Sequence, residues 1–155
     1  MSCRSASQTS LFAILLLITG CEPRYSYHPV TATGGTESRF RDKIGDVKFS
    51  MEPYDTTTGA KSILQSLFID NGSTTEVVVL GAELETGGKT FPAKIYRDAE
   101  GEKERIVPPK FSKSVSLAFA FSASASEVLN QDITWVWHLG IGDEEHTLHV
   151  PMRRN

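Results

Sequence analysis

Trp135 and Trp137 are the most conspicuous side chains in the sequence that could bind a ligand. They stand two residues apart in a segment that alternates apolar and polar residues, so on a strand they would share one face. Exposed indoles in that arrangement could stack on a sugar ring or a peptide. Ile133 and Leu139 fall on the same face, which favours a place for both tryptophans in the core. A carbohydrate-binding module is therefore an alternative that depends on the exposure of the two rings.

Titratable side chains gather in two further places. His146 and His149 follow three carboxylates, but residues three apart on a strand point to opposite faces, and zinc needs three or four converging ligands. The carboxylates from Asp98 to Glu104 lack the spacing of an EF-hand calcium loop, in which the glycine comes later. We expect both groups to be solvated charges and to hold no metal.

The sequence contains none of the common catalytic templates. There is no Gly-x-Ser-x-Gly elbow, no His-Glu-x-x-His pair and no phosphate-binding P-loop. Glu83 and Glu85 would share a strand face, where they could serve as acid and base or simply be hydrated. We predict that the protein is not an enzyme and needs no cofactor. A hydrolase with an unfamiliar site is a further, less favoured alternative.

Cys21 stands in a context that is typical of exported proteins. It follows an apolar run from Leu11 to Ile18, then Thr19 and Gly20, and a short segment carrying Arg4 precedes that run. As a helix, the run with its two small residues would rise about 15 Å, roughly half the hydrocarbon thickness of a bilayer. This layout indicates an export signal rather than a membrane-spanning helix.

The segment Ile18-Thr19-Gly20-Cys21 resembles the lipobox of bacterial lipoproteins. The resemblance implies that a signal peptide of residues 1–20 is cleaved between Gly20 and Cys21. It also implies that Cys21 carries a diacylglyceryl group, usually with a further acyl chain such as palmitate, which anchors the protein in a membrane of the bacterial cell envelope. Glu22 differs from the Asp that favours inner-membrane retention in enterobacterial relatives, so inner and outer membrane both stay open. A general secretory signal with an unmodified Cys21 is the alternative.

The chain that remains after such cleavage is mildly acidic. The whole sequence has 16 basic and 19 acidic side chains, and the loss of Arg4 gives a formal net charge of −4. This balance does not support nucleic-acid binding, which requires a basic patch. With Cys3 removed and Cys21 acylated, no cysteine is left for a disulfide, a thiolate nucleophile or a metal. The domain must be held together by burial of its core.

Residues 21–43 are rich in Pro, Gly, Ser and Thr, which predicts a flexible tether spanning roughly 25 Å. From residue 44 the apolar period is two, the period of a half-buried strand. Pro92 predicts an edge strand, because proline cannot donate to a ladder. On the segment 76–85, the pattern places Val78 and Leu80 on the core face together with Ala82 and Leu84. Strands are expected at 47–52, 62–70, 76–85, 90–96, 106–107, 112–122, 133–139 and 148–152, with a turn at 71–72 and one helical turn within 124–130.

About seven short strands and almost no helix predict a single all-β domain over residues 44–155. The pattern is similar to an immunoglobulin-like antiparallel β-sandwich, without the paired cysteines and central tryptophan of antibody-type domains. Such a likeness carries no activity with it. We expect a lipid-anchored envelope protein with a binding or assembly role, whose partner is another protein. The Pro92 strand and the 97–105 loop are the expected contact regions.

Overall fold

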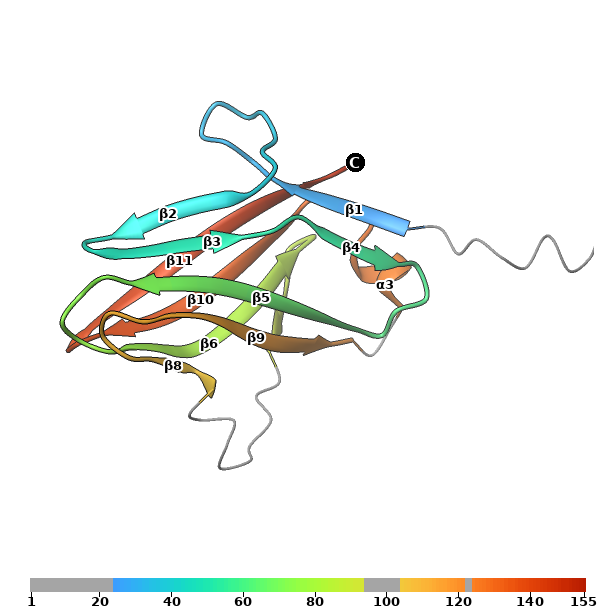
Figure 1. The fold of residues 1–155 in the computed structure, drawn as a ribbon. Coiled ribbons are helices and arrows are strands. Elements are labelled where there is room, and N and C mark those ends of the chain that lie inside the picture. Colours follow the sequence, from blue (N-terminus) through green and yellow to red (C-terminus); the bar gives the residue numbers. More distant parts are fainter. Residues whose placement is uncertain (1–23, 94–103, 122–123) are drawn as a thin grey trace, which may run out of the picture.

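The described part of the chain folds into two antiparallel β-sheets (Figure 1). The computed structural model describes residues 24–93, 104–121 and 124–155. This confirms the all-β class. The elements are β1 (Arg24–Pro29), β2 (Phe40–Ile44), β3 (Val47–Met51), β4 (Tyr54–Thr57), β5 (Ser62–Asn71), β6 (Val77–Thr86), β7 (Lys89–Pro92), β8 (Ile106–Val107), β9 (Ser112–Ala120), α3 (Ala125–Val128), β10 (Ile133–Ile141) and β11 (Glu144–Arg154).

The larger sheet has seven strands in the order β4-β1-β11-β10-β6-β7, and β8 also pairs with β6. The smaller sheet has the order β2-β3-β5-β9. The strand that carries Pro92, β7, lies at an edge as expected. The described residues thus contain eleven strands rather than about seven. The additional ones are mostly short strands, such as β1, β2 and β4, whose residues show little apolar alternation.

The two sheets share one hydrophobic core. Phe119 on β9 and Trp135 on β10 come from different sheets, and their ring centroids are 4.8 Å apart. On β9 the predicted alternation is confirmed, because Val115, Leu117 and Phe119 are all buried. Burial of this apolar surface is the main stabilising contribution in a domain whose described residues include no cysteine.

The prediction of a flexible tether through residue 43 is wrong for two of its segments. Arg24–Pro29 forms β1, which pairs with β4 on one side and β11 on the other, and β2 begins at Phe40. Tyr27 is fully buried, and its hydroxyl donates a hydrogen bond to the carbonyl of Leu129. The segment looks polar in sequence, but its backbone N–H and C=O groups are paired with β4 and with β11, the last strand of the chain.

The predicted face of β6 is also wrong in its first half. Leu139 of β10 pairs with Val79, whereas His138 pairs with Gly81, so Leu80 is an extra residue in the ladder. This β-bulge turns Val77 and Val79 into the core and leaves Leu80 largely exposed. Ala82 and Leu84 lie on the core face as expected.

The short helix α3 begins where the sequence predicts a cap. Ser124 is the N-cap residue, and its backbone N–H donates to the Glu127 carboxylate over 3.0 Å. Of the helices within the described residues, none is long and apolar enough to cross a membrane. Gly20, Cys21 and most of the 97–105 loop lie outside the described residues.

Candidate functional site

Trp135 and Trp137 do not form a binding surface. Both indoles are 0% exposed. Trp135 packs edge-on against Tyr54 and at a tilt against Phe119, which fills the space between the sheets. The prediction of a stacking platform, and with it the carbohydrate-binding alternative, is therefore wrong for this structure. The core placement with Ile133 and Leu139 is the one observed.

Among the described residues, histidines and carboxylates come together only in pairs. His138 lies 3.8 Å from the Glu83 carboxylate, and His146 lies 3.5 Å from Glu144. In the parts of the chain that the structure describes, no three His, Cys, Asp or Glu side chains are placed to hold a metal ion. All four side chains lie on β6, β10 or β11 of the larger sheet and are partly or largely exposed, as expected for surface charges.

The outer face of the smaller sheet exposes two large apolar side chains. Leu64 is 61% exposed and Phe68 is 43% exposed, and both belong to β5. Strand alternation explains this, because Ile63, Leu67 and Ile69 turn inward and bury their side chains. The neighbours of Leu64 and Phe68 on β9 are small, Ala118 and Ser114, so these two apolar groups stand clear of the sheet. Sequence reasoning identified β5 but not this outward face.

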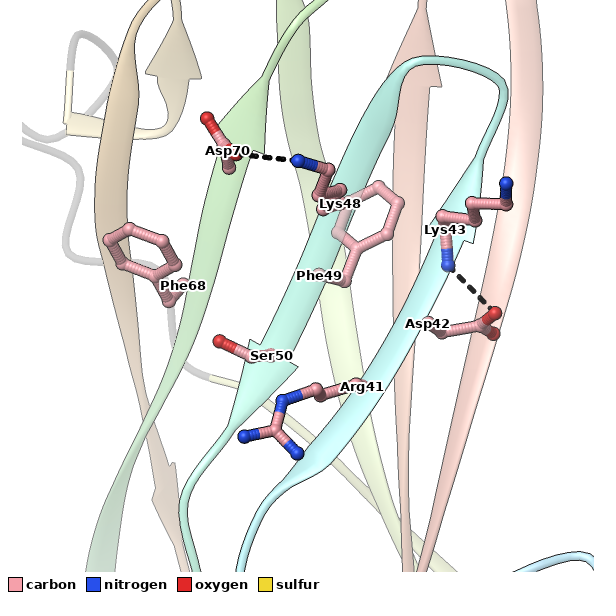
Figure 2. Close-up of a pocket in the computed structure, with 8 residues that line it drawn as sticks. All are labelled: Arg41, Asp42, Lys43, Lys48, Phe49, Ser50, Phe68 and Asp70. Atoms are coloured by element: carbon pink, nitrogen blue, oxygen red, sulfur yellow. Dashed lines mark hydrogen bonds and ion pairs between the residues drawn. The ribbon is translucent and has the colours of Figure 1, made fainter.

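A hollow of about 450 Å³ lies beside Phe68 (Figure 2). Pairing across the sheet sets Arg41, Ser50 and Phe68 in one row, and Lys43, Lys48 and Asp70 in the next row. Figure 2 shows Lys48 extended toward Asp70 and the Ser50 hydroxyl pointing toward the side of Phe68. The Lys48–Asp70 ion pair spans 3.6 Å. The hollow thus combines an aromatic ring with cationic groups.

A second hollow, of about 470 Å³, adjoins the first because Ser50 and Phe68 line both. Its lining includes Leu64, and its rim carries the ion pair between Arg39 and Glu52. The two hollows together form one surface on the outer face of the smaller sheet, which we name the β5 face. It is made by β2, β3, β5 and β9.

The charges on the β5 face do not balance. Arg39 pairs with Glu52, and Lys48 pairs with Asp70. Within the described residues, the side chains of Arg41 and Lys43 make no hydrogen bond or ion pair, although the backbone N–H of Lys43 donates to the Asp42 carboxylate over 2.8 Å. Arg41 and Lys43 are thus cations without a side-chain partner, and with the Asp42 carboxylate that lines the same hollow they leave an excess of one positive charge on a face of a chain whose net charge is negative.

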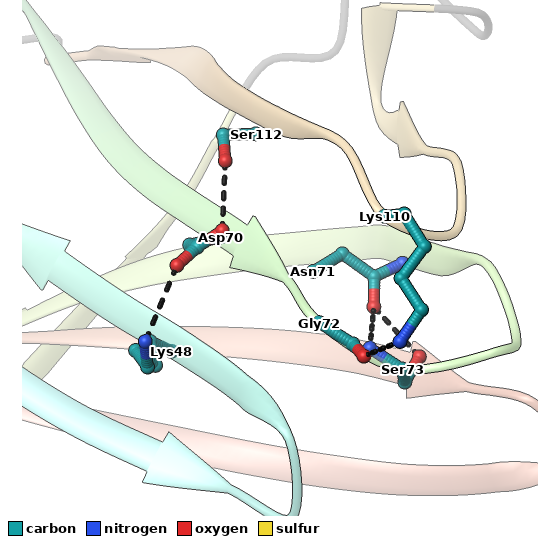
Figure 3. A network of polar contacts seen from close by, with 7 residues as sticks. All are labelled: Lys48, Asp70, Asn71, Gly72, Ser73, Lys110 and Ser112. Carbon is teal, nitrogen blue, oxygen red and sulfur yellow. Dashed lines mark hydrogen bonds and ion pairs between the residues drawn. The ribbon is translucent and has the colours of Figure 1, made fainter.

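A polar network fixes the end of the sheet at which the first hollow lies (Figure 3). Asp70 accepts a hydrogen bond from Ser112 over 2.8 Å and also pairs with Lys48, so it joins β3, β5 and β9. Lys110, which has a positive φ of 62°, donates to the carbonyl of Gly72. A Cβ on Gly72 would lie 2.7 Å from the carbonyl oxygen of Asp46, so the close approach of these two turns requires glycine.

Asn71 is the buried centre of this network. Its amide nitrogen lies 2.8, 3.0 and 3.1 Å from the carbonyl oxygens of Thr75, Val107 and Pro108, so that one of its two N–H groups is shared between two of these acceptors. Its amide oxygen accepts from the Ser73 backbone N–H and hydroxyl. One side chain thereby ties the turn after β5 to the segment after β8. The chain turns one residue later than predicted, because Asn71 is the last residue of β5 and residues 72–76 connect it to β6 in the other sheet; Asn71 holds this connection in place.

Comparison with known proteins supplies no family for this chain. No protein-family model matches it, and no curated protein matches it. Among solved structures, it is similar to a protein from Listeria monocytogenes EGD-e that is described as functionally unknown. That similarity covers 74% of this chain and 82% of the other, at 10% identity and a TM-score of 0.48. A likeness this slight carries no functional argument.

Proposed function

We propose that the protein is a lipid-anchored lipoprotein of the bacterial cell envelope that binds a partner protein through the β5 face. The proposal treats its domain as an immunoglobulin-like β-sandwich that serves as a scaffold and not as an enzyme. The lipobox-like segment ending at Cys21 supports the anchoring. The observation that carries the binding role is the exposure of Leu64 and Phe68 beside two unpaired cations.

The chemistry of the β5 face defines the partner segment that would fit it. Exposed apolar side chains rimmed by polar groups are typical of protein-binding surfaces. Arg41 and Lys43 would attract carboxylates of the partner. An apolar residue between those carboxylates would pack against Phe68. The partner is therefore an acidic segment that also carries an apolar anchor. Complementary charges of this kind raise the association rate and select the partner.

Site-specific photo-crosslinking in the native host tests the binding role. A benzophenone amino acid at position 68 is expected to give a crosslinked product of defined mass. The same group at Glu85, exposed on the outer face of the larger sheet, is expected to give none. Equal products from both positions, or none from position 68, would overturn the β5 face as the binding surface.

A charge-reversal pair tests the proposed partner chemistry. Lys43→Glu should greatly weaken the crosslink at position 68, because it places a negative charge beside the acidic segment. Lys89→Glu makes the same change on β7 of the other sheet and should leave the crosslink unchanged. An unaltered crosslink in Lys43→Glu would show that the partner is not selected by charge.

A further inference from the structure

The distance between Cys21 and the folded domain is very short. β1 begins at Arg24, so only Glu22 and Pro23 separate the cysteine from a strand that is paired on both sides. Three Cα–Cα steps span at most about 11 Å. The expected tether of roughly 25 Å is thus not present between the proposed anchor and the sheet.

From this spacing we infer that one end of the domain lies directly on the phospholipid head groups. The inference rests on the proposed acylation of Cys21. Acyl chains place that residue at the boundary of the hydrocarbon, and the head-group layer is roughly 5–8 Å thick on each side. A chain limited to about 11 Å cannot lift Arg24 clear of this layer by more than a few ångströms.

The residues at this end are held together by strand pairing and backbone hydrogen bonds. Arg24 pairs with Thr57 at the end of β4, and the turn from β4 to β5 follows directly. The α3 helix is fixed to this turn, because Ala125 N–H donates to the Ala60 carbonyl over 2.7 Å and Ser126 N–H donates to Thr58 over 3.0 Å. Figure 1 shows the start of β1, the end of β4 and α3 at the same end of the molecule. We name this set the proximal end.

The proximal end carries two exposed cations, and its two exposed carboxylates, Asp55 and Glu127, already accept hydrogen bonds from Ser26 and Ser124. Arg24 and Lys61 are both exposed. Neither side chain has a hydrogen-bond or ion-pair partner within residues 24–93, 104–121 and 124–155. Lipid phosphates would supply partners for both cations. Cations within a few ångströms of a membrane are attracted to such phosphates.

The same orientation determines where the first hollow is presented. Asp70 lies eight residues along β5 from Ser62, a distance of about 27 Å at the usual rise of a strand. In Figure 1, the β2–β3 turn and the end of β5 lie at the opposite end from the start of β1. The hollow beside Phe68 would then open beyond the head groups, where a partner in the aqueous envelope can reach it.

Depth measurement on the full-length acylated protein in vesicles tests this orientation. The vesicles contain phosphatidylethanolamine, phosphatidylglycerol and a lipid with a nitroxide on its head group. Because Cys3 is removed and Cys21 is acylated under the proposal, one introduced cysteine accepts a fluorescent label uniquely. The label goes at Lys61→Cys for the proximal end and at Asp143→Cys for the opposite turn, between β10 and β11.

The nitroxide lipid should strongly quench the label at position 61 and leave the label at position 143 at its unquenched intensity. Insertion of a ten-residue Gly-Ser linker between Pro23 and Arg24 should remove most of the quenching at position 61. Equal quenching at both positions in acylated, vesicle-bound protein would overturn the orientation alone. An unmodified Cys21 in the mass spectrum, with protein that does not float with the vesicles, would instead overturn the anchoring on which both proposals rest.

Discussion

Replacement of Asn71 by alanine should destabilise the domain more than its small size suggests. Asn71 is almost fully buried, and its amide nitrogen serves three carbonyls. Removal leaves the buried Val107 carbonyl without that donor, and an unsatisfied buried group costs about 1–3 kcal/mol. The bonds to Thr75 and Pro108 are partly buried, and their loss adds about 0.5 kcal/mol each.

We therefore expect Asn71→Ala to lower the free energy of unfolding by about 2–4 kcal/mol. In a domain of this size, that corresponds to a fall in melting temperature of roughly 8–15 °C. Urea titration followed by tryptophan fluorescence measures this change, because both tryptophans lie in the core. The denaturant slope should stay the same, since the surface exposed on unfolding is nearly unchanged.

Asn130→Ala is the matched control for this prediction. Asn130 is exposed, and its side chain makes no hydrogen bond to any other residue that the structure describes; its backbone carbonyl accepts from Arg154 over 2.6 Å. The control should change the free energy of unfolding by less than about 0.5 kcal/mol. A loss for Asn71→Ala as small as that of the control would refute the role of Asn71 as the link between β5 and β8.

Three further predictions concern the core and the β5 face. Burial raises the pKa of Tyr27 to about 12. As the pH rises, the tyrosine of the unfolded chain therefore loses its proton first, and the free energy of unfolding should fall between about pH 10 and 12. Equilibrium unfolding of Tyr27→Phe should show a smaller fall over the same pH range. In thermal unfolding, Leu67→Ala should lower the free energy of unfolding by about 2–5 kcal/mol and Leu64→Ala by less than about 0.5 kcal/mol. Both leucines belong to β5, but Leu67 is buried in the core and Leu64 is exposed on the outer face. Equal losses would contradict the assigned faces. Iodide should quench Trp135 and Trp137 only weakly in the native protein, and quenching as strong as in urea would show that the indoles are exposed.

The strands that could be predicted are those with their own regular alternation. On β9 each apolar residue alternates with a small or polar one, so the inward face was correct from the sequence. β1 has no such pattern beyond Tyr25 and Tyr27, and its stability comes from pairing with β4 and β11. Contacts between distant segments leave little trace in a local window, so this strand was missed.

The β-bulge at Leu80 shows a different limit. An apolar run such as residues 77–80 fits either face of a strand, and one extra residue in the ladder exchanges the faces. The sequence carries no marker for that insertion. It was likewise unable to decide the exposure of Trp135, since the choice depended on which side of β10 the second sheet would cover.

The β5 face could not be predicted at all from local patterns. Arg41 comes from β2, Ser50 from β3 and Phe68 from β5, and only the pairing of these strands brings the three side chains into one row. The exposed apolar residues on β5 were visible as part of an apolar run. What the run could not reveal was that Leu64 and Phe68 are left uncovered by the fold.

Mass spectrometry of the intact protein, purified from the membranes of its own host, tests the central claim most directly. The account predicts a chain that begins at Cys21, lacks residues 1–20 and carries the added mass of a diacylglyceryl group, with or without a further acyl chain. A chain that retains Met1, or one that begins at residue 21 with an unmodified thiol, would contradict it.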